Sequence, residues 1–479
     1  MSIIDSDLLS IQQARIILEE ALTAKSSLNE LPCNISQDYL RLVVKYFESN
    51  IENIIEQANF ESNYGTSKDE LILAKYYLAN FQKDLDKYPK IGQVVKGQYE
   101  ENITGRPKGI CLSILPAYLP IVVTMQNIIL AIHTRNPIIL IPNERCKNQI
   151  IKIIDDLQEI ALNNYYPKAA ISVLKYLSKK GEEELYRSND INFVIENRLC
   201  ENSRYDGKVS ADWFSASIGN NIVFIEKTAN IAKAAKDIVR SKAFNNGLLP
   251  GIEQAVVVES PVYVAFKLAL EKEGAYFLDK EQQGKIEKAI YDSYFMPRKE
   301  LIGKSAYEIA KIAEIELPSD TQILVVTKPY VSMNSPYSRE KYHPILSLYI
   351  EDDWRHACEK CIELILNDQK GQSLSIYTSD SYVIEQFIEK KPVSRVLVNT
   401  STGFGSIGIG SDLPLSFCLS TKQSAGVSCK SLIPAHFMFF REIGTSIEDP
   451  NSILTRYSFN ERKCTQSLFE QTINNSIEN

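Results

Sequence analysis

The pattern of apolar and polar positions changes once along the chain. From about Leu8 to Leu85, apolar residues recur at helical spacing, with polar interruptions near Asn34 and over 63–66. We therefore expect an N-terminal layer of helices. Beyond it, short runs rich in Val, Ile and Leu alternate with helical stretches. These runs are 137–141, 191–195, 222–225, 255–258, 323–326, 345–350, 374–377 and 396–398. Continuous apolar strands separated by helices are typical of parallel sheets that are buried on both faces.

The strands fall into two sets that are divided near 239–247. Two such sets predict two α/β lobes with a cleft between them, and clefts of this kind often hold cofactors. We expect residues 1–240 to form the helical layer together with a cofactor-binding-like α/β domain. Residues 241–430 are predicted to form a catalytic-like α/β domain, and residues 431–479 a C-terminal arm and tail.

One uncharged stretch, from Gly109 to Ile132, is long enough to suggest a membrane helix. Pro116 and Pro120 interrupt it, together with polar side chains such as Asn127. A strand over 109–115, a proline-bracketed loop and an amphipathic helix over 121–132 account for the stretch better. We therefore expect no membrane partner.

Composition narrows the function classes further. The 479 residues carry a formal net charge of -7 with mixed signs, whereas binding to nucleic acid needs clustered Lys and Arg. The first residues lack the basic flank and apolar core of a signal peptide, which favours a cytoplasmic protein. The nine scattered cysteines agree with this, since free thiols usually act as small buried hydrophobic groups.

The segment 241–254 reads SKAFNNGLLPGIEQ and precedes an apolar run. It resembles the active-site stretch of the aldehyde dehydrogenase superfamily, and is most similar to the CoA-acylating branch, which has SKTFDNG, two residues, Cys, two residues and EQ. Further matching segments follow in the family's order; they are 134–136, 190–192, 219–220, 339–344 and 397–399. The resemblance implies an α/β fold with two Rossmann-like lobes, NAD or NADP as cofactor, and no metal. It also implies a homo-oligomer, with 88–104 and the C-terminal segment in an oligomerisation arm.

Three positions differ from the chemistry that this resemblance implies. Pro250 stands where the family has its nucleophilic cysteine, so it offers no thiolate to attack a carbonyl and no backbone N–H to hold the oxyanion. Leu119 stands where the family has an oxyanion-binding Asn, and the loss of one such donor costs about 10²- to 10³-fold in rate. Gln372 replaces a histidine of the acylating branch, and it does not titrate near neutral pH.

The expected cofactor cradle is altered as well. After the strand over 191–195 the family has a glycine-rich turn, where close approach of the backbone to a pyrophosphate is needed. This chain has Asn197-Arg-Leu-Cys-Glu201 there, and Arg198 is interpreted either as a phosphate contact or as a solvated turn residue that fills the old pocket. Glu340 matches the carboxylate that binds the nicotinamide ribose in the family, or else anchors a loop.

Other candidates remain beside the altered site. Glu253 either holds the local turn and strand or keeps a catalytic use. Cys418 and Cys429 lie near the family's glycine-rich segment by the cleft, so either could be a displaced nucleophile. Cys358 and Cys361 have metal-like spacing, but they sit on one helix face without a second pair, which favours core packing.

Three functional hypotheses follow. The first is a catalytically silent aldehyde dehydrogenase homologue that acts by binding or oligomer assembly, with itself or with an intact relative. The second is an active NAD(P)-dependent aldehyde dehydrogenase or acyl-CoA reductase with a displaced nucleophile. The third is a small-molecule sensor whose modified cleft holds a ligand without reacting.

Overall fold

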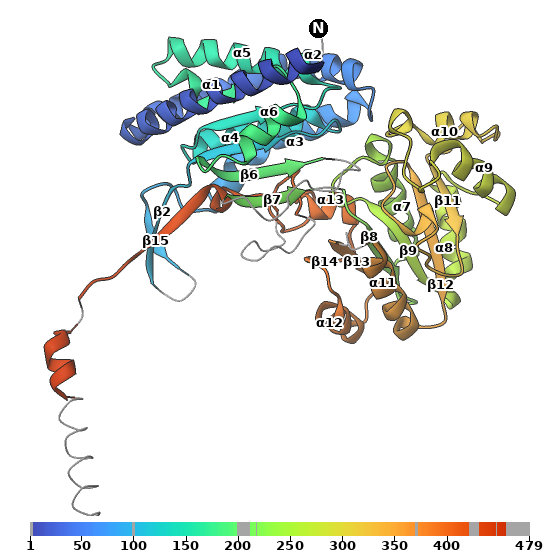
Figure 1. Ribbon diagram of the computed structural model, residues 1–479. Coiled ribbons are helices and arrows are strands. Elements are labelled where there is room, and N and C mark those ends of the chain that lie inside the picture. The colour runs from blue at the N-terminus through green and yellow to red at the C-terminus, as the bar shows by residue number, and fades with distance from the viewer. Residues whose placement is uncertain are drawn as a thin grey trace, which may run out of the picture.

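The computed structural model describes residues 3–97, 101–198, 211–216, 218–368, 372–420, 431–446 and 448–456. Within them, the strands form a five-stranded sheet, a seven-stranded sheet and a small three-stranded sheet (Figure 1). All strand pairs in the two larger sheets are parallel, as the uninterrupted apolar runs predicted. The fold class is therefore confirmed as α/β.

The N-terminal layer consists of three helices, α1 (Ile3–Glu30), α2 (Cys33–Ser62) and α3 (Ser67–Leu85). Their ends coincide with the predicted polar interruptions. Asn63 adopts a left-handed backbone with φ 54° at the end of α2, which an Asn tolerates better than most residues. The Thr66 hydroxyl then accepts a hydrogen bond from the Asp69 N–H and so caps the start of α3.

The first lobe is built on the five-stranded sheet, whose strand order is β5-β4-β3-β6-β7. Its strands are β3 (Ile110–Ile114), β4 (Ile138–Ile141), β5 (Ile171–Val173), β6 (Ile191–Asn197) and β7 (Asp212–Ala216), and its helices are α4 (Pro120–His133), α5 (Lys147–Asn163) and α6 (Lys179–Tyr186). The uncharged stretch is thus a strand and a helix, β3 and α4, as predicted, but α4 is not amphipathic, because every residue from Pro120 to Ile132 is buried. Among the described residues, no helix has the length and apolar character needed to cross a membrane.

The second lobe is built on the seven-stranded sheet, whose order is β10-β11-β12-β9-β8-β13-β14. Its strands are β8 (Asn221–Ile225), β9 (Glu253–Glu259), β10 (Ala275–Phe277), β11 (Ile323–Thr327), β12 (Ile345–Glu351), β13 (Ser373–Tyr377) and β14 (Arg395–Val398). Its helices are α7 (Ile231–Ala243), α8 (Ser260–Lys272), α9 (Lys280–Ile290), α10 (Ala306–Ile312), α11 (Trp354–Asp368), α12 (Ser381–Lys390) and α13 (Thr402–Ser406).

The change from the first sheet to the second lies earlier in the chain than the apolar pattern placed it. β8 pairs with β9 and β13, so it belongs to the second sheet, and the change falls between Ala216 and Asn221. Periodicity alone cannot assign a strand to one of two parallel sheets, because a strand buried on both faces has the same apolar pattern in either.

The third sheet is antiparallel and joins two segments that are far apart in the sequence. β2 (Asn102–Pro107) pairs with β1 (Val94–Lys96) on one side and with β15 (Met438–Ile443) on the other. In Figure 1 this sheet projects away from the two lobes. The resemblance assigned two segments to an arm, 88–104 and the region after Ser431. The pairing of β2 with β15 places parts of both segments side by side in one sheet.

Candidate functional site

Pro250 occupies a tight turn immediately before β9. The Ile252 N–H donates a hydrogen bond to the Leu249 carbonyl oxygen at 3.1 Å, which places Pro250 and Gly251 at the two central positions of the turn. Gly251 has φ +80°, so the turn has the arrangement of type II, which favours Pro followed by Gly. A Cβ on Gly251 would lie 2.7 Å from the Ser406 Cβ. Pro250 therefore has a structural role that the comparison of motifs alone did not reveal.

The turn is surrounded by apolar side chains rather than by an open cleft. Leu248, Leu249 and Ile252 are fully buried, and they belong to the same core cluster as Leu119. Leu119 precedes α4 with a left-handed backbone, φ 46° and ψ 44°. Asn adopts this conformation more readily than Leu does, because a short polar side chain can hydrogen-bond locally. This backbone conformation agrees with the expectation that Leu119 stands where the family has an Asn.

Glu253 is buried at the first position of β9 and receives backbone N–H groups from the start of α13. Its Oε1 accepts hydrogen bonds from Thr402 N at 2.7 Å and from Gly403 N at 3.4 Å. A carboxylate at a helix N-terminus stabilises the unpaired N–H groups of the first turn. Burial raises the pKa of Glu253. Of its two interpretations, these contacts favour the one in which Glu253 holds the turn and strand together.

Two fully buried lysines lie next to this turn, and sequence reasoning missed both. Lys242 Nζ lies 3.2 Å from Gln254 Oε1, and burial lowers the pKa of Lys242 to about 7. Lys341 Nζ donates hydrogen bonds to the backbone oxygens of Gln254 and Arg339, both at 3.0 Å. A signal existed for Lys242, since it continues the buried stripe of α7 at helical spacing after Ala235, Ile238 and Val239.

Glu340, the expected ribose-binding carboxylate, is engaged within the protein. Its Oε1 accepts the Gly219 N–H, and its Oε2 accepts the Tyr342 hydroxyl at 2.7 Å. The side chain is 5% exposed. A carboxylate that already receives two donors has less capacity to hold a ribose diol. The residues at this end of the expected cradle therefore do not fit a nicotinamide ribose.

A cavity of about 380 Å³ lies at the carboxyl ends of β3 and β4, where open α/β sheets usually bind ligands. Arg198 lines it and pairs with Glu182 of α6, with Nη2 and Oε2 2.7 Å apart. The Arg198 side chain is only 12% exposed. It is therefore not the solvated turn residue that the sequence suggested, although it does line the pocket. Residues 199–201 of the altered turn lie outside the described residues.

Gln372 and Cys418 are also closed to solvent. Gln372 is 1% exposed, and its side-chain amide has no hydrogen-bond partner among the described residues. Cys418 is fully buried; its thiol points to the Asn127 amide oxygen at 3.8 Å and receives the Asn197 amide at 3.6 Å. Burial raises the pKa of Cys418 to about 12. Cys429 lies outside the described residues.

The Cys358 and Cys361 pair packs in the core of the second lobe, as predicted. Lys391 Nζ lies 2.5 Å from the Cys358 thiol and 2.9 Å from its carbonyl oxygen. Among the described residues, no group of three or more His, Cys, Asp or Glu side chains could hold a metal ion.

Comparison with known proteins agrees with this architecture. The solved structure of an acetylating aldehyde dehydrogenase from Geobacillus thermoglucosidasius superposes with a TM-score of 0.86 at 25% identity, covering 92% of this chain and 98% of that one. A probable aldehyde dehydrogenase from Listeria monocytogenes superposes with a TM-score of 0.87 at 26% identity, covering 94% and 99%.

Sequence relatives point the same way. The chain is 28% identical over 368 residues to the bifunctional aldehyde-alcohol dehydrogenase of Escherichia coli strain K12, covering 74% of this chain and 40% of that protein. It is 23% identical over 399 residues to an acetylating succinate-semialdehyde dehydrogenase of Clostridium kluyveri, covering 82% and 87%. The chain thus spans less than half of the bifunctional relative. Residues 3–277, more than half of the chain, match the aldehyde dehydrogenase family, and the chain belongs to that family, with relatives in its CoA-acylating branch.

Proposed function

We propose that this protein is a catalytically silent member of the aldehyde dehydrogenase family that acts by binding, either in a homo-oligomer or with an intact relative. The observation that carries the proposal is the Pro250–Gly251 turn, which stands where the family's reaction needs a thiolate. In that reaction the sulfur adds to the carbonyl, hydride leaves the tetrahedral adduct, and a thioester remains. A proline ring supplies no nucleophile for the first step.

The surroundings of Pro250 support the same conclusion. An oxyanion formed at this site would lack both hydrogen-bond donors that the family supplies. Pro250 has no backbone N–H, and Leu119 has no polar side-chain group. The motifs match Glu253 and Glu340 to carboxylates of the family. Both accept hydrogen bonds from backbone N–H groups of this chain. These internal contacts occupy one oxygen of each carboxylate.

The small antiparallel sheet supports a role in assembly. β15 presents Phe439, Phe440 and Ile443 with 37–41% of each side chain exposed, and Val94 of β1 is 57% exposed. By their strand register, Val94, Phe439 and Ile443 lie on one face of this sheet and Phe440 on the other. Exposed large apolar side chains on a projecting sheet are typical of a surface that another chain covers. We propose that a second copy of this chain or an intact relative covers it.

Turnover assays test the proposal directly. The purified protein is given acetaldehyde or propionaldehyde with CoA and either NAD or NADP, and formation of the reduced cofactor is followed, with the E. coli bifunctional enzyme as positive control. We expect no turnover above background. Acyl-CoA incubation followed by peptide mass spectrometry should likewise find no acylated side chain. Turnover at enzyme-like rates, or an acyl adduct on any residue of the cleft, would contradict catalytic silence.

Assembly is tested separately by sedimentation. The wild-type chain is compared with a Phe439→Ser and Phe440→Ser double variant, and with a matched Tyr165→Ser variant on an exposed loop. We expect the double variant to dissociate to a smaller species while the Tyr165 variant keeps the wild-type mass. A monomeric wild-type chain that also fails to join an intact relative would argue against the assembly role without affecting the catalytic proposal.

A further inference from the structure

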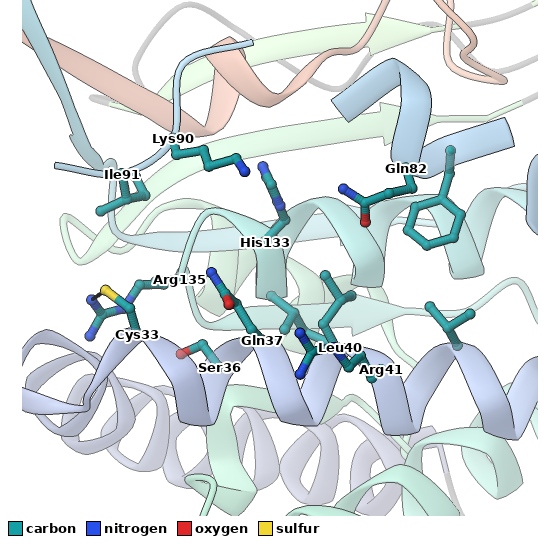
Figure 2. Close-up of a pocket in the computed structure, with 13 residues that line it drawn as sticks. Cys33, Ser36, Gln37, Leu40, Arg41, Gln82, Lys90, Ile91, His133 and Arg135 are labelled. Atoms are coloured by element: carbon teal, nitrogen blue, oxygen red, sulfur yellow. Dashed lines mark hydrogen bonds between the residues drawn. The ribbon is translucent and has the colours of Figure 1, made fainter. Parts of the chain in front are cut away.

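A second cavity lies in the N-terminal helical layer and includes none of the substituted catalytic positions. It has a volume of about 420 Å³ and is formed between α2, α3, the end of α4 and the segment that leads into β1 (Figure 2). Cavities of this size hold small organic ligands. The thirteen lining residues are Cys33, Ser36, Gln37, Leu40, Arg41, Val44, Phe81, Gln82, Lys90, Ile91, Ile132, His133 and Arg135.

One part of the lining is apolar. Leu40 and Val44 of α2 lie one turn apart on the same face, and Phe81 of α3 and Ile132 of α4 complete this surface. Leu40, Phe81 and Ile132 also belong to the main core cluster, which fixes their positions. A hydrocarbon group placed here would be removed from water, and each buried methylene strengthens binding.

The rest of the lining is cationic. Arg41, Lys90 and Arg135 all face the cavity, whereas none of the thirteen described lining residues is acidic. Burial lowers the pKa of His133, the nearby Lys90 charge lowers it further, and Asp86 acts in the opposite direction. Figure 2 shows the Lys90 and His133 side chains next to each other. The electrostatic field in the cavity therefore favours an anion.

Two of these cations form only weak ion pairs within the chain. Arg41 pairs with Asp38 at 2.6 Å, but both side chains are mostly exposed, and Lys90 lies 3.8 Å from an exposed Asp86. Exposed ion pairs contribute little to stability, so a bound anion can replace them at little cost.

Two buried donors in the lining have no partner among the described residues. Ser36 is 5% exposed, and its hydroxyl makes no hydrogen bond there; the same is true of the Arg135 Nε–H. Arg135 is otherwise held in place, because its guanidinium donates to the Leu28 and Leu31 carbonyl oxygens at the end of α1. A buried polar group without a partner is destabilising, and a ligand oxygen would supply the missing hydrogen-bond acceptor.

We propose that this cavity binds a small amphipathic carboxylate, that is, a monocarboxylic acid with a short hydrocarbon chain. The hydrocarbon chain lies on Leu40, Val44 and Phe81, and the carboxylate faces Arg41 and Lys90 and accepts the Ser36 hydroxyl. The site is separate from the family's catalytic cleft, so it does not depend on whether the protein is catalytically silent.

Calorimetric titration of the full-length chain with hexanoate tests the site. Hexanamide keeps the hydrocarbon chain but removes the charge, and acetate keeps the charge but removes most of the chain. We expect saturable binding of hexanoate, with both comparison ligands weaker by about tenfold or more, because each lacks one of the two interactions. A rise of the thermal midpoint with hexanoate should follow, since a ligand bound only by the native state stabilises it.

Variants then locate the bound ligand. Arg41→Gln with Lys90→Gln should weaken hexanoate at least about tenfold, whereas Lys45→Gln, an exposed charge on α2 outside the lining, should leave it unchanged. Both sets change only exposed side chains, so folding is preserved. Val44→Trp should fill the apolar part and block binding independently of charge. Absence of saturable hexanoate binding to the wild-type chain, or equal binding by the double variant, would overturn the proposal.

Discussion

The Tyr342 hydroxyl donates a hydrogen bond to Glu340 at 2.7 Å, and on its other oxygen Glu340 accepts the backbone N–H of Gly219. Gly219 leads into β8, so this carboxylate joins the start of the second sheet to the loop before β12. The residue that resembles a cofactor ligand is thus part of the internal structure that connects the two segments.

Replacing this carboxylate should therefore lower stability rather than alter cofactor affinity. In Glu340→Gln an amide NH₂ group replaces one of the two oxygens that accept hydrogen bonds, so one donor loses its acceptor. We expect a loss of about 1 to 3 kcal/mol in the free energy of unfolding. Urea unfolding measures this, with the exposed Glu316→Gln as control. Unchanged stability accompanied by weaker NADH binding would instead assign Glu340 to a cofactor.

Substitutions in the Pro250–Gly251 turn should lower stability by different amounts. Pro250→Ala should cost about 0.4 to 1 kcal/mol, because proline limits the unfolded chain and its φ suits this turn position. Gly251→Ala should cost more, since its φ is +80° and the new Cβ would meet Ser406 at 2.7 Å.

Gly410→Ala is the matched control, because Gly410 has φ +76° but a Cβ added there would meet nothing within 4 Å. It carries the backbone strain without the steric contact. The loss of stability in urea should therefore increase in the order Pro250→Ala, Gly410→Ala, Gly251→Ala. Equal effects of the two alanine substitutions at glycine would show that Ser406 moves aside.

Thiol reactivity separates a buried cysteine from a nucleophile. Cys33 is exposed, whereas Cys418 is buried with a pKa raised to about 12 by burial, so little thiolate forms at neutral pH. We expect iodoacetamide to label Cys33 in the native protein and Cys418 only after unfolding. Peptide mass spectrometry follows each site, and Cys33→Ser serves as the control for assignment. Rapid native labelling of Cys418 would revive the hypothesis of a displaced nucleophile.

Glu70 makes a prediction about pH. It is buried on α3, its Oε1 accepts the Ile121 and Val122 N–H groups at 2.8 and 3.1 Å, and burial raises its pKa to about 7. The folded state therefore holds a proton that the unfolded state releases near pH 4.5. This contribution to stability is complete below pH 4.5 and is lost as pH rises towards 7.

Between pH 4.5 and pH 7, Glu70 should lower the free energy of unfolding by about 3 kcal/mol, because each unit of pKa shift corresponds to about 1.36 kcal/mol. In Glu70→Gln the carboxyl group is absent, so its unfolding free energy should fall less between pH 5 and pH 8 than that of the wild type. The exposed Glu56→Gln should follow the wild type. A variant with the same pH dependence as the wild type would show that Glu70 stays ionised beside the N-terminus of α4.

Several features of the candidate site can be read from the sequence. The expectation that Pro250, Leu119 and Gln372 replace functional residues of the family comes from aligning short motifs, since each such change alters which atoms are present. Their consequences cannot be read in the same way. That Pro250 forms a tight turn depends on Gly251 and on the Leu249 carbonyl, and the engagement of Glu340 depends on Gly219, which lies more than a hundred positions away.

The sequence by itself determined the helical layer and the parallel strands, and it predicts the loss of the nucleophile at Pro250, because apolar periodicity and residue chemistry are local properties. Only the tertiary structure decided that β8 belongs to the second sheet, that Arg198 pairs with Glu182, and that Ser36 and Arg135 line one cavity with Lys90. These relationships join residues from separate elements, and their energies depend on burial and distance, which arise only when the elements pack together.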